Sequence, residues 1–436
     1  MSRLVRAAAG AFVLWFASCA GATTITLETV ANSTTTPPGS SLPFSGFGVS
    51  TPSINNGHIA FRGQTLGQNS GIYRDSGSGL QLIADRNTVN PGPIGPANTL
   101  SIFGNASVDA SGNVAFRSSV ASSGTTAIYV GDGGVLDQRI SRDQPVPGLP
   151  GQIFLGFSTP QLDDDLVTVD GTIGPSGSGG AFNIIRETPT TIERLASLGQ
   201  TLPGGTQGFS LFGSPVTENG NTAFAGFGTP GLGQQSGVFS DASGSLQPVM
   251  ISGTTLIPGT SDPFGFIGLQ EVGVDRDGED VVFVGYSADF LTSGIYGLID
   301  GTLTTLVDSN TLLPGSTTET FNAGGFTGLG YDNGNLLFVG ADSSFNRGLY
   351  ALYEGVLIEI ASGGDTVGGV DSVFNFGLSQ VDQSISGNQF TFLAQGNQGV
   401  EVVRGTFGDP IPEPATCVLF GAGFLACVTS QRRQKA

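Results

Sequence analysis

The chain has 436 residues, including 70 glycines and 23 prolines, and a formal net charge of −19. Between residues 23 and 414 it holds 35 acidic residues, 11 arginines and no lysine, which gives this part a net charge of −24. Such a surface repels phosphate backbones and anionic lipid headgroups, so the composition excludes nucleic acid as a partner.

The N-terminus predicts export. Arg3 and Arg6 precede an uncharged, mostly apolar run over residues 7–16, and Ala20-Gly21-Ala22 fits a small-x-small cleavage site. This order is typical of a secretory signal peptide over residues 1–22. An alternative makes Cys19 a lipidation site, because residues 16–19 loosely resemble a lipobox.

The exported body contains no cysteine. Cys19 lies in the signal peptide, and Cys417 and Cys427 lie near the C-terminus. No disulfide can form within the body, so we expect its stability to come from burial and strand pairing.

The body consists of seven copies of one unit. The first repeated feature is a β-prone triplet that recurs every 53 to 59 residues and ends at Phe61, Phe116, Val169, Phe224, Phe283, Phe338 and Phe392. A second triplet follows it, as in Gly71-Ile72-Tyr73, with Gly180-Ala181-Phe182 assigned to the third copy and Gly399-Val400 to the seventh. A third feature is an aromatic column, which we expect to pack between repeats, at Phe47, Phe103, Phe157, Phe212, Phe266, Phe326 and Phe376.

A fourth repeated feature is out of phase with the others. In most copies a strand-like run is followed by Pro-Gly, as in residues 80–85 with Pro91-Gly92. The seventh of these runs stands at the front of the chain, over residues 25–31 before Pro38-Gly39. A closed ring explains this displacement, because strands from both ends of the chain can complete one blade.

These repeats predict an all-β fold. Each unit of about 55 residues holds about four short strands separated by Gly-Asn or Asp-Gly turns. Tandem sandwiches need about 100 residues per unit, and a β-solenoid coil needs far fewer than 55. We therefore predict a seven-bladed β-propeller over residues 23–409, closed by residues 25–31 as the outer strand of the last blade.

The C-terminal segment, residues 410–436, has a separate character. Pro412-Glu413-Pro414 precedes an apolar stretch expected to form a helix over residues 415–430, and residues 431–436 carry Arg432 and Arg433. Its fourteen apolar residues would rise about 21 Å as a helix, short of a ~30 Å hydrocarbon core. The positive-inside rule would leave the body outside the cytoplasm. A plain membrane anchor is one interpretation of this short transmembrane helix.

The order Pro-Glu-Pro, short apolar helix and terminal arginine pair resembles the PEP-CTERM sorting tail of exported proteins in Gram-negative bacteria. This resemblance implies processing by an exosortase at the cell surface, often alongside exopolysaccharide production. It assigns sorting or processing roles to Pro412, Glu413, Pro414, Arg432 and Arg433.

Polar turns offer candidate sites within the body. Oxygen-rich turns that would suit calcium, but equally suit tight hairpins, occur at residues 55–57, 109–113, 218–221, 275–280 and 332–335. Arg276 intrudes on the most charged of them, and we favour hairpin chemistry. His58, the only histidine, is expected to be a turn residue, since a triad or zinc site would need partners it lacks. Asp163-Asp164-Asp165 is interpreted as a solvated acidic turn.

Together these features predict a non-catalytic propeller without a cofactor, held at the outer cell surface through its C-terminal helix before processing. It would act as a binding or matrix component, with extracellular polysaccharide or a surface protein as partner. The alternative is a hydrolase of extracellular glycans with paired carboxylates on the propeller scaffold. A purely structural coat protein is a third interpretation.

Overall fold

The computed structural model describes residues 23–48, 51–67, 69–92, 98–177, 179–231, 233–379 and 383–408. Residues 27–406 form one compact unit. The remainder forms a second unit, residues 1–26 with 407–436, whose described parts are joined by a hydrogen bond of 2.8 Å from Gly408 N to Thr24 O.

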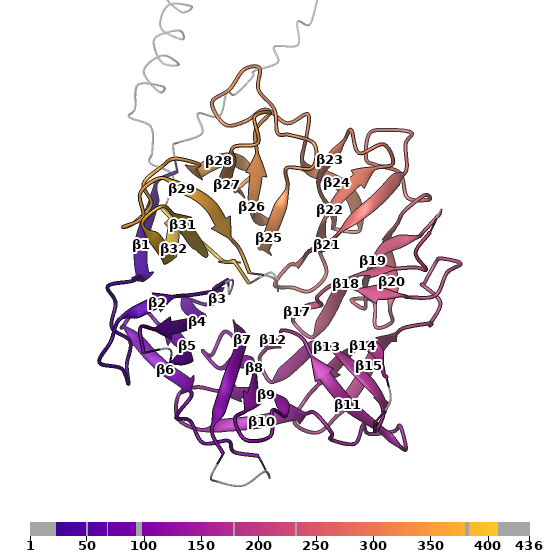
Figure 1. The fold of residues 1–436 in the computed structure, drawn as a ribbon. Helices are drawn as coiled ribbons and strands as arrows, with labels where there is room; N and C mark the ends of the chain where they lie inside the picture. Colours follow the sequence, from indigo (N-terminus) through magenta and orange to yellow (C-terminus); the bar gives the residue numbers. More distant parts are fainter. Residues whose placement is uncertain are drawn as a thin grey trace, which may run out of the picture. The chain divides into compact units, whose positions relative to one another are not determined.

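Seven separate antiparallel sheets follow one another around a common axis (Figure 1). We call each sheet a blade and letter its strands A to D from the axis outwards. In blades 1, 3, 4 and 7 strand A is divided into two short strands, both of which pair with strand B.

Blades 1 to 3 have the following strands. Blade 1 contains β2 (Phe44–Gly46), β3 (Ser53–Asn55), β4 (His58–Thr65), β5 (Ser70–Asp75) and β6 (Leu80–Asp85). Blade 2 contains β7 (Leu100–Val108), β8 (Val114–Val120), β9 (Thr126–Gly131) and β10 (Leu136–Ser141). Blade 3 contains β11 (Gln152–Phe157), β12 (Gln161–Asp163), β13 (Leu166–Pro175), β14 (Ala181–Glu187) and β15 (Ile192–Ser197).

The remaining blades repeat the pattern. Blade 4 contains β16 (Leu211–Phe212), β17 (Val216–Glu218), β18 (Asn221–Phe227), β19 (Ser236–Ser240) and β20 (Gln247–Ile251). Blade 5 contains β21 (Phe264–Val274), β22 (Val281–Ser287), β23 (Ser293–Ile299) and β24 (Thr302–Asp308). Blade 6 contains β25 (Thr327–Asp332), β26 (Asn335–Ala341), β27 (Arg347–Tyr353) and β28 (Val356–Ser362). Blade 7 contains β29 (Val373–Gly377), β30 (Ile385–Ser386), β31 (Gln389–Gly396), β32 (Gly399–Phe407) and β1 (Ile25–Ala31).

The predicted closure of the ring is confirmed. In blade 7 the strand order is β1-β32-β31-β29, so the N-terminal strand is the outer strand of the last blade. Figure 1 shows β1, in indigo, beside β32, in yellow. The described residues thus form a seven-bladed all-β propeller without a helix.

The hydrophobic core lies between the blades. One cluster joins Ala60, Ile72 and Ala84 of blade 1 to Phe103 and Phe116 of blade 2. The predicted packing of the aromatic column between repeats is confirmed in the same way for Phe47, Phe157, Phe212 and Phe326. Phe266 departs from the prediction: its side chain is 37% exposed, and Phe264, fully buried, takes the interior position.

Two predicted alignments of strand C are wrong, by three residues in blade 3 and by two in blade 7. Tyr73, the last residue of its triplet, pairs with Phe61 of strand B. The residue that pairs at the same position is Ile185 in blade 3, not Phe182, and Val403 in blade 7, where the predicted Gly399-Val400 would place residue 401. In both blades the residues assigned to the triplet lie at the start of strand C, and the residue that pairs with the first triplet lies further along the strand. Phe182 accordingly lies near the exposed start of β14.

Two of the Pro-Gly pairs, at Gly39 and Gly204, are turns that pack on the next blade. Gly39 and Gly204 have φ values of 79° and 69°, as the third position of a type II turn requires. A Cβ added at Gly39 would lie 3.2 Å from Leu82 in β6, and one at Gly204 would lie 3.1 Å from Pro248 in β20. Each turn therefore closes against an outer strand.

Candidate functional site

The turns between strands A and B meet around the ring axis. We call this end of each blade the A–B edge. In blades 1 to 7, these turns begin in order at Asn55, Asp109, Asp163, Glu218, Asp275, Asp332 and Ser386. These turns bond to one another: Gly220 N donates to Asp163 Oδ2 at 2.8 Å, and Gly387 N donates to Asp332 Oδ2 at 2.5 Å. Several of the carboxylates that resemble calcium ligands therefore hold neighbouring blades together.

Arg276 crosses this end of the ring. Its Nη2 donates to Asn55 Oδ1 of blade 1 at 3.2 Å and to Ser386 Oγ of blade 7 at 2.6 Å. Its Nε lies 3.5 Å from Asp332 Oδ1 of blade 6. The guanidinium of blade 5 thus contacts the A–B turns of blades 1, 6 and 7.

Burial disfavours the ionised form of two carboxyls at the A–B edge, Glu218 and Asp332. Burial raises the pKa of Glu218 well above its usual value, the charges of Asp163 and Asp332 raise it further, and Arg276 lowers it. Burial also raises the pKa of Asp332, against hydrogen bonding from Gly387 N and the charge of Arg276. Within the described residues, no group of three or more His, Cys, Asp or Glu side chains could hold a metal ion.

His58 and Asp163 both contact residues of a neighbouring blade. His58 begins β4 and is half-buried, and burial and then the Arg74 charge lower its pKa. A Cβ at Gly112 of blade 2 would lie 3.1 Å from its ring, so His58 packs at the boundary between blades 1 and 2. The aspartates separate: Asp163 accepts from Gly220, whereas Asp164 and Asp165 are exposed, as expected for a solvated turn.

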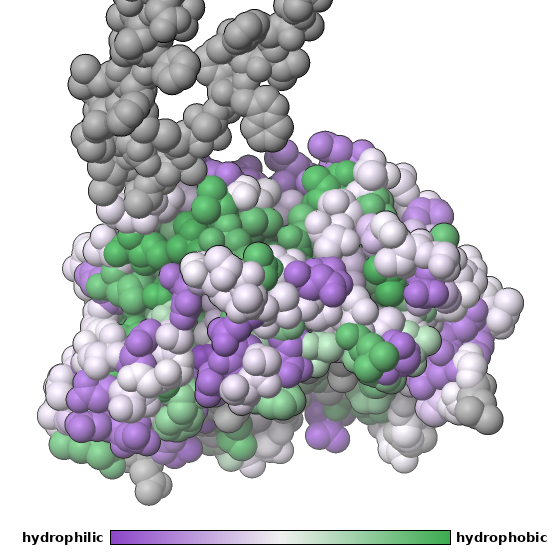
Figure 2. All heavy atoms as spheres, turned by 90° about the horizontal axis from the view of Figure 1, so that it is seen from above, coloured by the Kyte–Doolittle hydropathy of each residue, from purple (hydrophilic) through white to green (hydrophobic). Residues whose placement is uncertain are grey.

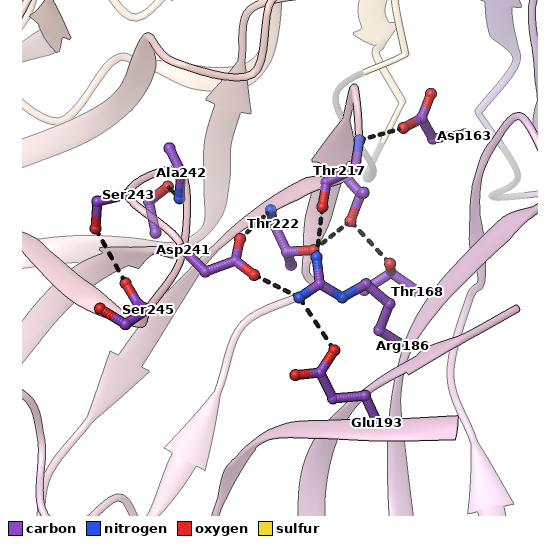
Figure 3. Close-up of polar contacts among 12 residues, drawn as sticks. Asp163, Thr168, Arg186, Glu193, Thr217, Thr222, Asp241, Ala242, Ser243 and Ser245 are labelled. Carbon is purple, nitrogen blue, oxygen red and sulfur yellow. Dashed lines mark hydrogen bonds and ion pairs between the residues drawn. The ribbon is translucent and has the colours of Figure 1, made fainter. Parts of the chain in front are cut away.

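A repeated arginine joins neighbouring blades (Figure 3). Arg186 in β14 donates from Nη2 to Asp241 Oδ2 of blade 4 at 2.6 Å and from Nη1 to the Gly220 carbonyl. Asp241 also accepts from Thr222 N at 2.6 Å, so its second oxygen is occupied. Arg74 and Arg404 occupy the equivalent position of blades 1 and 7 and bond to the Gly112 and Gly57 carbonyls.

Sequence reasoning did not identify these arginines. In the observed register, each arginine directly follows the residue of strand C that pairs with the last residue of the first triplet. The incorrect alignments of blades 3 and 7 concealed this pattern. Their partners lie far away in the sequence, so the spacing alone could not identify the bonds.

Another ion pair lines a pocket between blades 2 and 3. Arg139 Nη2 lies 3.0 Å from Glu187 Oε2, and the two side chains are 5% and 6% exposed. The pocket of about 510 Å³ lies beside them, and burial raises the pKa of Glu187 to about 7 although Arg139 lowers it. Arg139 also donates to the Asp165 carbonyl at 2.7 Å, so the guanidinium is already engaged.

Another pocket, of about 460 Å³, lies between blades 6 and 7. Its walls combine two aromatic rings with amide, hydroxyl and guanidinium groups, from Phe345, Asn346, Arg347, Ser372, Phe374 and Asn397. Phe345 is 74% exposed and Phe374 is 52% exposed. None of the four pockets found among the described residues is lined by more than one carboxylate.

Exposed apolar side chains concentrate at one end of the blades. Strands B and C are joined at the edge opposite the A–B turns, and the D–A connections reach the same edge, which we call the B–C edge. Of the 15 large hydrophobic side chains exposed in the described residues, all but Val135 and Val356 lie at or near this edge. Figure 2, a side-on view of the ring, shows the molecule from the top of Figure 1. On this side, hydrophobic residues form a broad patch beside polar ones.

The predicted signal peptide and the sorting residues Pro412, Glu413, Pro414, Arg432 and Arg433 lie outside the described residues, as does the predicted apolar helix. Among the residues with described positions, no helix is long and apolar enough to cross a membrane.

Several solved structures and one protein family are similar to this chain. Similar solved structures include the β-propeller domain of the Trilobed protease from Pyrococcus furiosus, with 10% identity, TM-score 0.49, and coverage of 83% of this chain and 97% of that one. Oligogalacturonate lyase from Vibrio parahaemolyticus has 12% identity and TM-score 0.46, with coverage of 91% and 99%. The six-bladed Aleuria aurantia lectin has 11% identity and TM-score 0.32, with coverage of 73% and 96%.

The propeller and its seven blades follow from the strand pairing of this chain itself. No curated protein matches the chain. Residues 184–403 match the model of a family of unknown function, DUF7453, and the chain belongs to that family.

Proposed function

We propose that this protein is an exported, non-catalytic propeller that binds extracellular polysaccharide or a surface protein at the outer cell surface. The C-terminal tail resembling a PEP-CTERM signal would deliver it there, with an exosortase-type enzyme acting near Pro412, Glu413 and Pro414. Before processing, the apolar helix of the tail would hold the chain in the membrane.

The observation that carries the binding role is the unequal chemistry of the two ends of the blades. The A–B edge is polar, and its turns and Arg276 bond to one another. Of the 15 large hydrophobic side chains exposed in the described residues, 13 lie at or near the B–C edge. Concentrated exposed apolar groups with polar surroundings are typical of interaction surfaces.

A glycan hydrolase is the second candidate, and the observation in its favour is Glu218. Its pKa is raised by burial, as a general acid requires, and Asp163 lies close enough to raise it further. Against this reading, Asp163 accepts a hydrogen bond from Gly220 and Arg276 lies among the turns.

Two measurements test these proposals. Fractionation of a bacterium that makes an exosortase should find the chain on the outer surface, open to added protease. Replacing Pro412, Glu413 and Pro414 by alanine should retain it in the membrane. A purely cytoplasmic chain would overturn the proposal. If the protein releases reducing ends from polysaccharides, and Glu218→Gln abolishes this activity, the protein is a hydrolase instead.

A further inference from the structure

Phe345 is displayed at the B–C edge in an unfavourable backbone conformation. It lies in the hairpin between β26 and β27, is 74% exposed, and has a φ of 63°. A positive φ is a genuine outlier for a bulky side chain, and glycine adopts it without steric cost. In the same hairpin of blades 2, 3 and 4, the positive-φ positions include Gly124, Gly177 and Gly233.

Hydrogen bonds within the hairpin hold the backbone at Phe345. Asp342 Oδ1 accepts from Ser344 N at 2.8 Å and from Asn346 N at 2.9 Å, and Oδ2 accepts from Asn346 Nδ2 at 2.9 Å. Phe345 N itself donates to the Asp342 carbonyl at 3.0 Å. Because this backbone is already ordered, binding a ligand costs less conformational entropy.

Blade 5 provides an internal comparison. Phe290 occupies the equivalent hairpin with a φ of 59°, but its ring lies 6.4 Å from Phe266 and 6.0 Å from Tyr286, centroid to centroid. Phe345 and Phe374 make no such contact with another ring of the described part of the chain. Their faces are therefore available to a ligand.

Polar groups surround the two rings. Arg347 Nη1 donates to Asn375 Oδ1 of blade 7 at 3.1 Å, which orients the guanidinium across the blade boundary. Asn346, Ser372 and Asn397 add amide and hydroxyl groups to the same pocket. Its volume of about 460 Å³ falls within the ~300–1,000 Å³ of typical ligand sites.

We propose that this pocket binds a pyranose unit of a polysaccharide, with Phe345 and Phe374 packing on sugar C–H faces and Arg347, Asn346 and Asn397 bonding to hydroxyls. A pyranose combines apolar faces with a rim of hydroxyls, which is the arrangement that these walls complement. A purely apolar ligand would cover the remaining hydrogen-bonding groups of Arg347, Asn346 and Asn397 without bonding to them, at a cost in affinity. The inference rests on the proposed binding function and names its ligand class.

The test uses the purified protein and four oligosaccharides: cellohexaose, maltohexaose, chitohexaose and an alginate hexamer, which separates neutral from acidic sugars. Phosphatidylcholine vesicles test a lipid ligand instead. We expect at least one sugar to bind by calorimetry and to show saturation transfer from phenylalanine ring protons.

The decisive variant is Phe345→Gly, because glycine suits the φ of 63° and the fold should be kept or stabilised. It should weaken sugar binding by about tenfold or more, and Phe374→Ala should do the same. Phe290→Gly, the matched change in blade 5, should alter the affinity less than about twofold.

Three results would overturn the inference. Equal sugar binding by Phe345→Gly and the parent would place the sugar elsewhere, and the proposed function would stand. Binding to vesicles but to none of the sugars would show that Phe345 and Phe374 contact lipid instead. A chain that is exposed at the surface but binds none of the sugars would contradict a sugar ligand for this pocket. A chain found only in the cytoplasm would contradict the proposed function itself.

Discussion

Arg404 in β32 donates a hydrogen bond of 2.5 Å from Nη2 to Oδ2 of Asp75 in β5, and the two side chains are 9% and 10% exposed. This pair joins blade 7, which closes the ring, to blade 1. The equivalent position in blades 4, 5 and 6 holds Ser240, Gly297 or Ala351. Each boundary from blade 7 round to blade 4 is therefore joined by an arginine: Arg404, Arg74, Arg139 and Arg186 in turn.

Arg404→Met should lower the free energy of unfolding by about 3–5 kcal/mol, because it leaves Asp75 buried without its cation. Urea unfolding followed by fluorescence and circular dichroism would measure the change. The control is Arg142→Ala, since the Arg142–Asp143 pair is exposed and 3.9 Å long, and its loss should change the stability by less than about 0.5 kcal/mol. Equal effects of the two variants would show that the Arg404 pair does not stabilise the closure.

Most of the fold could be predicted from the repeat pattern, for a physical reason. Triplets such as Val281-Val282-Phe283 lie in strand B, which is covered on both faces by neighbouring blades, so its apolar character is continuous and visible in the sequence. The displaced run over residues 25–31 predicted the closing strand because only a ring needs one.

The candidate sites were less predictable. Asp332 and Arg276 are 56 positions apart, and Arg276 and Asn55 are 221 apart, so only the closed ring brings them together. The pocket between blades 6 and 7 likewise depends on the exposure of Phe345 and Phe374, which the composition of their turns does not indicate.

Gly285→Ala should destabilise the protein by about 1–3 kcal/mol through overpacking. Gly285 lies two residues after Phe283, and a Cβ there would lie 2.7 Å from Phe264 and 3.2 Å from Tyr296. Gly46→Ala is the matched control, since a Cβ at Gly46 meets nothing within 4 Å, and it should change stability by no more than about 0.5 kcal/mol. Chemical denaturation of both variants measures the difference, and a neutral Gly285→Ala would contradict the close aromatic packing.

Arg276→Met should destabilise the protein more at pH 8 than at pH 5. Arg276 lowers the pKa of Glu218 and Asp332, both of which burial raises, so its removal raises these pKa values further. At pH 8 the ionised carboxyls would repel one another without the guanidinium, at a cost of about 1–3 kcal/mol, and protonation relieves this as the pH falls.

Thermal unfolding of Arg276→Met across this pH range measures the effect. Arg86→Met removes the same charge from an exposed side chain and serves as the control. A loss of stability independent of pH would mean that Arg276 acts through packing alone.

The buried carboxyl between blades 2 and 3 should make the protein less stable as the pH rises. Burial raises the pKa of Glu187 to about 7, above the value of about 4.3 expected in the unfolded chain. Between these values the folded state binds more protons than the unfolded state, so stability falls from about pH 4.3 to pH 7. Burial raises the pKa of Asp170 to about 6, which acts in the same direction.

Glu187→Gln removes this titration but keeps an oxygen for Arg139, whose Nε donates to Oε1 at 3.2 Å. The variant should therefore lose less stability than the parent between pH 5 and pH 7.5, with the slopes differing by at most about 1.4 kcal/mol per pH unit. Urea midpoints at half-unit intervals of pH give both slopes, with Asp143→Asn as the exposed control. Parallel curves for the parent and Glu187→Gln would mean that Glu187 titrates alike in both states, and that the Arg139 charge offsets its burial in full.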